Sequence, residues 1–493
     1  MKSYMIYGLM SMVLFGWFSC APSRMQVAQV RDKLDVEQPW RYNIDAQEKA
    51  VLRPEFPKAQ KAKLKNGLEI FVVSDSRLPI AQLSLVFKAG SAQDEKKLAG
   101  LMYLSAHMLK EGAGALSSLA FAEALANIGT DLSVAVAKDM TSIHAEVLSH
   151  KVDDAFALLA LMVKKPQLNP DDFMRLKSQH QSALKSQQAN PSYMAQVNFL
   201  AAAYGDKHPY GHPNAGSLDT IKHITLPDIK KAVHDHFGAD RAALVVVGDV
   251  SLEQIVKLSH DHLDSWQKAR AKAHAIPEPM GSKDMQTKLI SRSDSPQTYV
   301  LVGHLAASKK DPKLASFEVF QNIIAGMPTS RLGANLREEK GWTYGVASQL
   351  NPLAIKGPLF ITTSIQNPHG ADALGEILKE LDSLKSKAVS DEELARAKSG
   401  LLHSYASRFS TLSQVANSVA EQFAYGLADD YEAQFFDQIT KVSAHDIIQV
   451  AKKVGDREHM VAVAIGDLDA LKAPIASMNV GRVTIKEDIN VKP

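Results

Sequence analysis

The sequence predicts an α+β protein built from two homologous domains that arose by internal duplication. Two groups of residues recur in the same order at offsets of 218 and 221 positions, which favours duplication over chance. In the first half, strand-like runs are interspersed with segments of helical periodicity. The recurring groups are Asp228-Ile229 with Gly248-Asp249, matched by Asp446-Ile447 with Gly466-Asp467, and Arg175-Leu-Lys177-Ser178, matched by Arg396-Ala-Lys398-Ser399.

The composition is that of an ordinary globular protein. Hydrophobic residues make up 45% and charged residues 22% of the 493 residues, and the formal net charge is +2. This balance contains no basic or acidic excess, so we expect no nucleic-acid partner and no acidic substrate. The single cysteine, Cys20, excludes an intrachain disulfide, so the fold must depend on its core.

Residues 1–20 have the pattern of an export signal. One early positive charge precedes an apolar run over residues 4–18, which is shorter than the roughly 20 residues of a membrane span. Cys20 stands where a bacterial lipoprotein signal is cut and acylated, although Trp17 and Phe18 depart from the usual residues there. We expect an exported, lipid-anchored protein facing the periplasm; an uncleaved anchor and plain secretion are the alternatives.

The rest of the chain is long enough for two large domains joined by a linker. The segment after the signal is polar, charged and rich in proline, which indicates a tether. A second stretch, rich in Ala and Lys and containing Pro277, Pro279 and Gly281, suits an exposed linker. The predicted parts are a tether at 21–57, an N-terminal domain at 58–265, a linker at 266–288, a C-terminal domain at 289–475 and a tail at 476–493.

Local patterns predict the elements of the first domain in order. The turn Asn66-Gly67 precedes a strand, and the alternation over Ala81–Phe87 predicts a half-buried strand. Pro227 is well placed in the first turn of a later helix. The predicted strands are 68–73, 81–87, 131–136 and 243–247, and the predicted helices are 100–110, 116–128, 171–188 and a helix that begins at 226.

The helix at residues 100–110 carries the candidate site. In an H-x-x-E-H motif the two His side chains lie four positions apart on one helix face and bind a single zinc ion. Here these positions hold Tyr103 and His107, and Ala106 replaces the Glu that serves as general base. The frame, with Gly100-Leu before the motif and Met-Leu after His107, resembles the pitrilysin-like (inverzincin) metallopeptidases, which include insulin-degrading enzyme and mitochondrial processing peptidase.

The resemblance implies a third ligand, a Glu eight residues before an Asn-Pro step, and this position is Ala183. His180, one turn earlier, offers a substitute nitrogen or is simply a solvated histidine on the helix face. A structural zinc needs about four ligands, so we expect this chain to bind no metal. The degenerate metal site comprises Tyr103, Ala106, His107 and Ala183.

The resemblance also implies a peptide-binding edge. In the resembled family, an extended substrate adds as a strand to the sheet edge beside the zinc through main-chain hydrogen bonds. The loop Asp206–His212 resembles the family's His-Pro-Tyr loop, so His208 and His212 are expected to be structural rather than metal ligands. The expected substrate-binding residues are Asp131, Leu132, Ser133, Val134, Ala135 and Val136.

The second domain carries the best-preserved signature, Leu336-Arg337-Glu-Glu-Lys-Gly-Trp-Thr-Tyr344. It resembles the family's Leu-Arg-Glu-x-x-Gly-x-x-Tyr element, in which the Arg and Tyr hold the substrate backbone and stabilise the oxyanion. The resemblance implies these roles for Arg337 and Tyr344, whose donors suit a carbonyl that gains negative charge. The alternative is a helix-end ion pair at Arg337 and a strand that starts at Tyr344.

The resemblance implies two domains, each a mainly antiparallel sheet with helices packed against it, that close around a chamber. The family includes heterodimers in which one subunit holds the zinc and the other, degenerate subunit supplies the Arg and Tyr. We therefore expect a non-catalytic subunit that lends Arg337 and Tyr344 to a homologous zinc-bearing partner acting on unfolded or extended peptides. The alternatives are a catalytically dead scaffold, like the core proteins of the respiratory cytochrome complex, and, with less support, a stand-alone metallopeptidase.

Overall fold

The computed structural model describes residues 53–272, 275–281 and 283–487, which belong to one compact unit that begins at Arg53. The predicted signal peptide, with Cys20, and most of the predicted tether lie outside the described residues. The final residues of the predicted tail, 488–493, lie outside them too. Within the described ranges, every helix is too short or too polar to cross a membrane.

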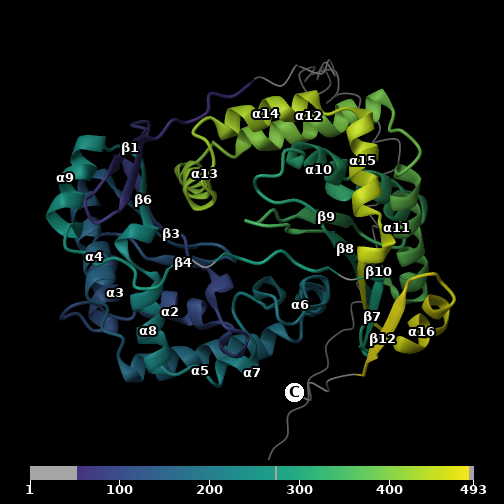
Figure 1. The fold of residues 1–493 in the computed structure, drawn as a ribbon, viewed down its shortest axis with the longest axis horizontal. Helices are drawn as coiled ribbons and strands as arrows, with labels where there is room; N and C mark the ends of the chain where they lie inside the picture. The colour runs from purple at the N-terminus through teal and green to yellow at the C-terminus, as the bar shows by residue number, and fades with distance from the viewer. Residues whose placement is uncertain (1–52, 273–274, 282, 488–493) are drawn as a thin grey trace, which may run out of the picture. The chain divides into compact units, whose positions relative to one another are not determined.

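The first half is built on a six-stranded sheet in the order β1-β2-β6-β3-β5-β4 (Figure 1). All neighbours in this sheet are antiparallel except β2 and β6, which are parallel. One face packs against helices of the same half and forms the main core. The strands are β1 (Gln60–Lys63), β2 (Glu69–Ser74), β3 (Ile80–Phe87), β4 (Ser133–Val136), β5 (Thr141–Leu148) and β6 (Ala242–Gly248).

The helices of this half have clear start signals in the sequence. Asn169 caps α5 by accepting the Asp171 N–H at 2.8 Å, and Pro170 occupies the first turn. Thr225 and Asp228 form a capping box at the start of α8. The helices are α2 (Leu101–Leu109), α3 (Ser118–Asn127), α4 (Val152–Lys164), α5 (Pro170–Gln187), α6 (Pro191–Tyr204), α7 (Leu218–Ile221), α8 (Leu226–His236) and α9 (Leu252–Leu263).

The second half repeats this plan with a sheet in the order β12-β7-β11-β8-β10-β9. Here β7 is parallel to both β11 and β12, and the other pairs are antiparallel. The prediction of two homologous α+β domains with mainly antiparallel sheets is therefore confirmed. The strands are β7 (Gln286–Ser291), β8 (Gln297–Leu305), β9 (Val346–Leu350), β10 (Pro358–Gln366), β11 (Val461–Gly466) and β12 (Arg482–Lys486); the helices are α10 (Leu314–Gln321), α11 (Gly370–Leu384), α12 (Asp391–Ser407), α13 (Leu412–Tyr425), α14 (Tyr431–Lys441), α15 (Ala444–Val454) and α16 (Leu468–Ala476).

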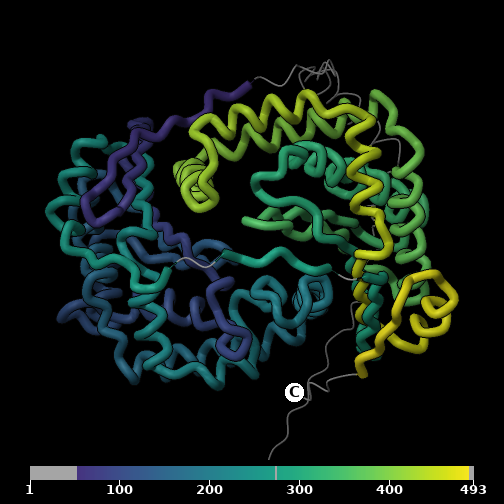
Figure 2. The backbone as a smooth tube through the Cα atoms, viewed as in Figure 1, coloured from purple at the N-terminus to yellow at the C-terminus, as the bar shows by residue number. Residues whose placement is uncertain are grey.

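Each half contributes one helix that packs on the sheet of the other half. Helix α6 packs on the second sheet, where the Phe199 and Phe360 rings lie 5.8 Å apart. Helix α13 packs on the first sheet, where the Phe71 and Phe423 rings lie 6.0 Å apart. The path of the backbone into and out of both helices can be followed in Figure 2, and the two helices begin 221 residues apart, at 191 and 412. The repeat therefore extends to the exchanged helices.

The exchange corrects one expectation about β3. The strand was predicted to be half-buried, but residues 81–87 are all buried. Leu83 and Leu85 point into the core of the first half, and Val86 on the opposite face packs against α13. The prediction was wrong because it assumed that one face met solvent, and a helix from the other half covers that face.

Residues 53–61 connect the two halves as an N-terminal strap (Figure 1). The Arg53 guanidinium donates to both carboxylate oxygens of Asp437 on α14, at 3.1 and 3.0 Å. The Phe56 ring packs edge-on against Phe409 at 5.3 Å and Phe436 at 5.8 Å. The last residues of the predicted tether thus bind the second half before the chain enters β1 in the first sheet.

Candidate functional site

Helix α2 begins at a position that only glycine fits easily. Gly100 has φ +96°, and a Cβ there would lie 2.8 Å from the Ala215 carbonyl oxygen. The Asp94 carboxylate accepts the backbone N–H groups of Gly100 and Met102, both at 2.9 Å. Burial raises the pKa of Asp94 to about 7 even though these two donors favour its charged form. The degenerate motif is thus held on a firmly capped helix.

The Tyr103 ring contacts the two histidines near the expected zinc position. Its centroid lies 4.3 Å from that of His107 and 4.4 Å from that of His180, on which it stacks at 23°. Burial, with smaller effects from Lys110 and His180, lowers the pKa of His107 to about 4. The His107 imidazole is therefore neutral near pH 7.

His180 is not a solvated histidine on the helix face. Only 7% of it is exposed, and one ring nitrogen lies 2.8 Å from the Ala215 carbonyl oxygen. Burial lowers its pKa, and this hydrogen bond acts in the opposite direction. The expectation of a solvated side chain was wrong because α2 supplies Tyr103 as a stacking partner for His180.

The remaining positions of the motif provide no ligand. Ala106 is fully buried, and Ala183 is exposed on α5 one turn beyond His180. Burial raises the pKa of Tyr103, so its phenol stays protonated. Zinc sites use three or four His, Cys or carboxylate ligands, and only one free imidazole, that of His107, is found here. These residues do not fit zinc, and we derive no hydrolytic step from them.

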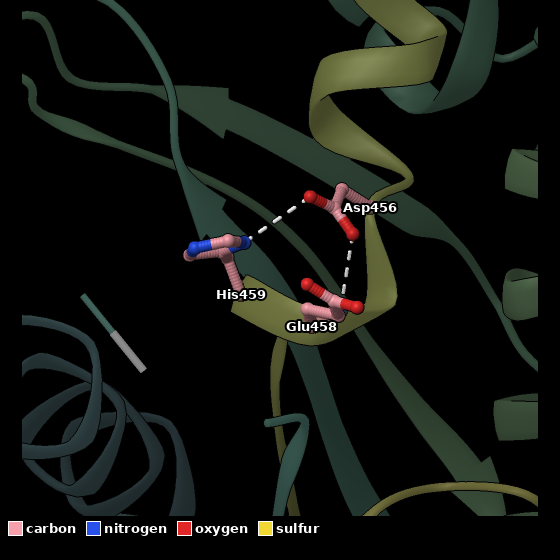
Figure 3. Close-up of side chains that lie close together, drawn as sticks. All are labelled: Asp456, Glu458 and His459. Carbon is pink, nitrogen blue, oxygen red and sulfur yellow. Dashed lines mark hydrogen bonds and ion pairs between the residues drawn. The ribbon is translucent and has the colours of Figure 1, made fainter. Parts of the chain in front are cut away.

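Elsewhere in the described ranges, one group of three side chains has ligand atoms within 4.8 Å of one another: Asp456, Glu458 and His459 (Figure 3). Asp456 caps the short helix Arg457–His459 by accepting the Glu458 N–H at 3.1 Å. The other Asp456 oxygen lies 3.1 Å from His459 Nδ1. Because local capping accounts for these contacts and Glu458 and His459 are exposed, the group is not assigned a metal.

Strand β4 is one of the two outer strands of the first sheet and lies beside α2. It pairs with β5 alone, and Ser133 and Ala135 are exposed. Side chains bind the carbonyl groups at its two ends, with Lys110 donating to Leu132 at 3.2 Å and Asn214 donating to Val136 at 3.1 Å. The predicted substrate segment is thus at a sheet edge, although its first two residues, 131 and 132, precede the strand.

The Arg337 and Tyr344 element adjoins β9, the outermost strand of the second sheet. Arg337 lies in a π-helical segment, Gly333–Glu339, and its exposed guanidinium is 3.4 Å from the Glu338 carboxylate. Such segments are rare and are frequent at functional sites. Tyr344 is 94% exposed, and its hydroxyl hydrogen-bonds no described residue.

Neighbours of Tyr344 hold this segment in place. Trp342 stacks on His369 with centroids 4.6 Å apart, and the Thr343 hydroxyl donates to the Ser364 carbonyl at 2.8 Å. Tyr344 therefore extends from an anchored segment into solvent. The described contacts do not bring Arg337 or Tyr344 against Tyr103 or His107.

Hydrogen bonds of both ring nitrogens of His208 hold its loop in place. His208 Nδ1 accepts the Tyr210 N–H at 3.0 Å, and Nε2 lies 2.8 Å from the Pro277 carbonyl oxygen.

Sequence reasoning missed a cavity of about 700 Å³ between the two halves, which we call the interdomain pocket. Two of its charged residues, Glu318 and Arg408, are 90 positions apart and match no motif, so no sequence signal could have grouped them.

Comparison with protein families gives two adjacent matches. The model described as insulinase, peptidase family M16, matches residues 70–214, and the model described as the peptidase M16 inactive domain matches residues 223–401. A Helicobacter pylori protein described as non-peptidase homolog YmxG is 25% identical over 75% of this chain and 85% of its own length. An uncharacterized zinc protease of Rickettsia felis is 24% identical over 80% of this chain and 94% of its own length.

Solved structures have the same fold. The crystal structure of a peptidase M16 inactive domain from Pseudomonas fluorescens aligns with a TM-score of 0.76 and 25% identity, covering 83% of this chain and 98% of that chain. A chain of Complex III2 from Candida albicans aligns with a TM-score of 0.73 and 16% identity, covering 83% of this chain and 96% of that chain. The second likeness concerns the fold alone.

Proposed function

The chain belongs to peptidase family M16 as a degenerate, peptidase-like member, and we propose that it is the non-catalytic subunit of a heterodimeric zinc peptidase. The proposal rests on a contrast between the halves. The motif helix holds Tyr103 and Ala106 where a zinc ligand and a base belong, whereas Tyr344 is 94% exposed. The Tyr344 phenol makes little contact with its own chain, so its hydroxyl is available to donate to another molecule.

In the proposed complex, a homologous partner subunit holds the zinc and the general base. The Tyr344 hydroxyl donates a hydrogen bond to the substrate oxygen that gains negative charge, and the Arg337 guanidinium binds the substrate backbone. Strand β4 has β5 as its one neighbouring strand, and this edge position supports an extended or unfolded peptide as substrate, because such a peptide pairs through backbone groups whatever its sequence. This chain contributes binding and positioning, and the bond-breaking chemistry belongs to the partner.

The proposed location follows from the first 20 residues. We propose that the chain is exported, cleaved before Cys20 and acylated there, so that it faces the periplasm from a membrane. The several acyl chains of a bacterial lipoprotein hold a protein more firmly than one chain does. A shared membrane would keep this subunit close to its partner.

Reconstitution tests the proposal. The purified chain is mixed with a homologous subunit from the same cell that has an intact H-x-x-E-H motif, and cleavage of an unfolded peptide is followed. We expect neither zinc binding at His107 nor cleavage by this chain alone, and activity in the mixture. Tyr344→Phe should leave assembly intact and lower kcat about 10²-fold to 10³-fold, as loss of one oxyanion donor does.

The matched control is Arg396→Ala, which removes an exposed arginine with a loose ion pair, 3.8 Å from Glu392, on α12. It should assemble and cleave like the wild type, whereas Arg337→Ala should weaken substrate binding. Full activity of both the Tyr344→Phe and Arg337→Ala complexes would favour the scaffold alternative. Peptide cleavage by this chain alone that depends on His107 would refute the proposal.

A further inference from the structure

A buried histidine at the end of β8 has one ring nitrogen without a partner in the described part of the chain. His304 is only 8% exposed, and its Nε2 atom is shielded from solvent and hydrogen-bonds no described residue. Its Nδ1 atom lies 2.5 Å from the Leu305 carbonyl oxygen, which places the ring proton on Nδ1 and leaves a lone pair on Nε2. Burial lowers the pKa of His304 to about 4, so the ring is neutral near pH 7.

This arrangement is typical of histidines that bind metal ions. A ligating imidazole usually donates its other N–H group to a carbonyl or carboxylate oxygen, which fixes the tautomer and orients the ring. His304 has this orienting contact through Leu305, while the nitrogen that would bind the ion is unused. A buried polar atom without a partner costs free energy, so the Nε2 lone pair calls for an acceptor of electron density.

The sheet register brings His304 to the three side chains that precede β11. Gly303 pairs with Val461, so the end of β8 adjoins the turn that leads into β11. The rings of His304 and His459 lie 5.9 Å apart at an angle of 63°. Two imidazoles on one tetrahedral zinc ion have ring centres about 5–5.5 Å apart, because each nitrogen lies about 2.1 Å from the ion. The two histidines are therefore close to the spacing of a shared ion.

The turn supplies the other candidate ligands. Capping by Asp456 and its hydrogen bond to His459 account for the contacts among the three residues of the turn, so these residues alone indicate no ion. Capping does not account for the unused nitrogen of His304. In Figure 3 the Nδ1 edge of the His459 ring points toward the Asp456 carboxylate, and the Glu458 carboxylate lies on the same side of the ring. Their ligand atoms lie within 4.8 Å of one another, so one ion can contact all three.

We propose that the second half binds one divalent transition-metal ion, with Zn²⁺ as the best fit, through His304, His459, Asp456 and Glu458. Two imidazole nitrogens and two carboxylate oxygens form a four-ligand set that suits zinc, whereas Mg²⁺ and Ca²⁺ prefer oxygen ligands alone. Glu458 and His459 are exposed and can adjust to the fixed, buried His304. The ion would join the end of β8 to the turn before β11, which is a structural role.

This inference does not depend on the proposed heterodimer, because all four residues belong to the second half and the degenerate motif belongs to the first. Calorimetric titration of the untagged chain with Zn²⁺ and with Mg²⁺ tests it. Zn²⁺ should bind at one site per chain and raise the Tm, and Mg²⁺ should do neither. The His107→Gln variant should bind Zn²⁺ like the wild type.

Three results of these titrations would overturn the proposal. No Zn²⁺ binding at millimolar concentration would leave the His304 nitrogen to a buried water. Equal binding of Mg²⁺ would mean that exposed carboxylates alone attract cations. Loss of Zn²⁺ binding in His107→Gln would locate the ion at the degenerate motif, and that result would also count against the proposed non-catalytic subunit.

Variants at exposed positions locate the ion. His459→Gln and Glu458→Gln should each weaken Zn²⁺ about tenfold or more and leave the Tm of the zinc-free protein unchanged. The matched controls, His403→Gln and Glu392→Gln, replace an exposed histidine and an exposed glutamate on α12 and should bind like the wild type. His304→Gln should abolish binding at one site per chain. If that variant fails to fold, the two exposed variants decide, since unchanged Zn²⁺ affinity in both would refute the assignment.

Discussion

His107 is the one residue of the zinc motif that remains, and its surroundings make it a pH-sensitive element of stability. Its pKa is lowered from 6.5 to about 4, and burial is the largest cause. Between these pH values the unfolded chain binds more protons than the folded chain, so the free energy of unfolding falls as pH drops from about 6.5 to 4. His107→Gln removes this pH-dependent contribution to the free energy of unfolding. From pH 7 to pH 5 the wild type should lose about 2 kcal/mol more than the variant.

Urea denaturation at the two pH values measures this difference. The matched control is His403→Gln, at an exposed histidine on α12, which should follow the wild type. Parallel pH profiles of wild type and His107→Gln would mean that His107 is protonated equally in the folded and unfolded chains. That result would contradict the burial argument for this site.

At the residue scale, the sequence showed which zinc-site residues are absent more clearly than it showed which contacts the substituted residues make. The absence of a ligand at Tyr103 and of a base at Ala106 is visible in five consecutive letters. The stacking of Tyr103 on His180 could not be predicted, because those residues are 77 positions apart and meet only when α2 packs against α5. The exposure of Tyr344 also depends on distant partners, since Trp342 is anchored by His369.

At the scale of elements, the N-terminal strap packs against the second half and so links the two halves. Phe56 lies among the rings of Tyr405, Phe409 and Phe436, with centroids 5.3–6.5 Å away. Phe56→Ala removes a partly buried ring and its edge-on contacts, and it should lower the free energy of unfolding by about 1–3 kcal/mol. Urea denaturation at pH 7 measures the loss.

The control for the strap is Leu119→Ala on α3, where the side chain is 71% exposed. Surface changes of this kind usually stay within about 0.5 kcal/mol of the wild type. If Phe56→Ala were as stable as Leu119→Ala, the strap would rest on the second half without stabilising it. A large loss for both variants would show that apolar truncation in general, rather than the strap contact, is being measured.

Element boundaries were the easiest features to predict, and exchanged packing was the hardest. Proline and capping residues fixed the start of α8 at Leu226, and alternating apolar residues placed β3 within one residue. These signals are local. The placement of α6 on the second sheet and α13 on the first is set by contacts between residues distant in the sequence, such as Phe199 with Phe360 and Phe71 with Phe423, so local patterns contain no sign of it.

At the scale of the whole molecule, the two halves have the same architecture but carry different candidate site residues. Strands β4 and β9 occupy corresponding positions, each as one of the two outer strands of its sheet. The broken zinc motif adjoins β4, and Arg337 with Tyr344 adjoins β9. In the proposed heterodimer, the metal site that the exposed Tyr344 assists belongs to a second chain.

A common membrane would support such an assembly, and Cys20 is where the sequence predicts the attachment. Cys20→Ser removes the thiol that is acylated, so the variant should appear in the soluble fraction or accumulate as an unprocessed precursor. Membrane fractionation combined with the mass of the intact protein distinguishes the two outcomes. The wild type should be heavier than its cleaved polypeptide by the mass of its lipid. Unchanged mass and unchanged membrane retention in Cys20→Ser would instead identify residues 4–18 as an uncleaved anchor, and the lipid would then have no part in bringing the two subunits together.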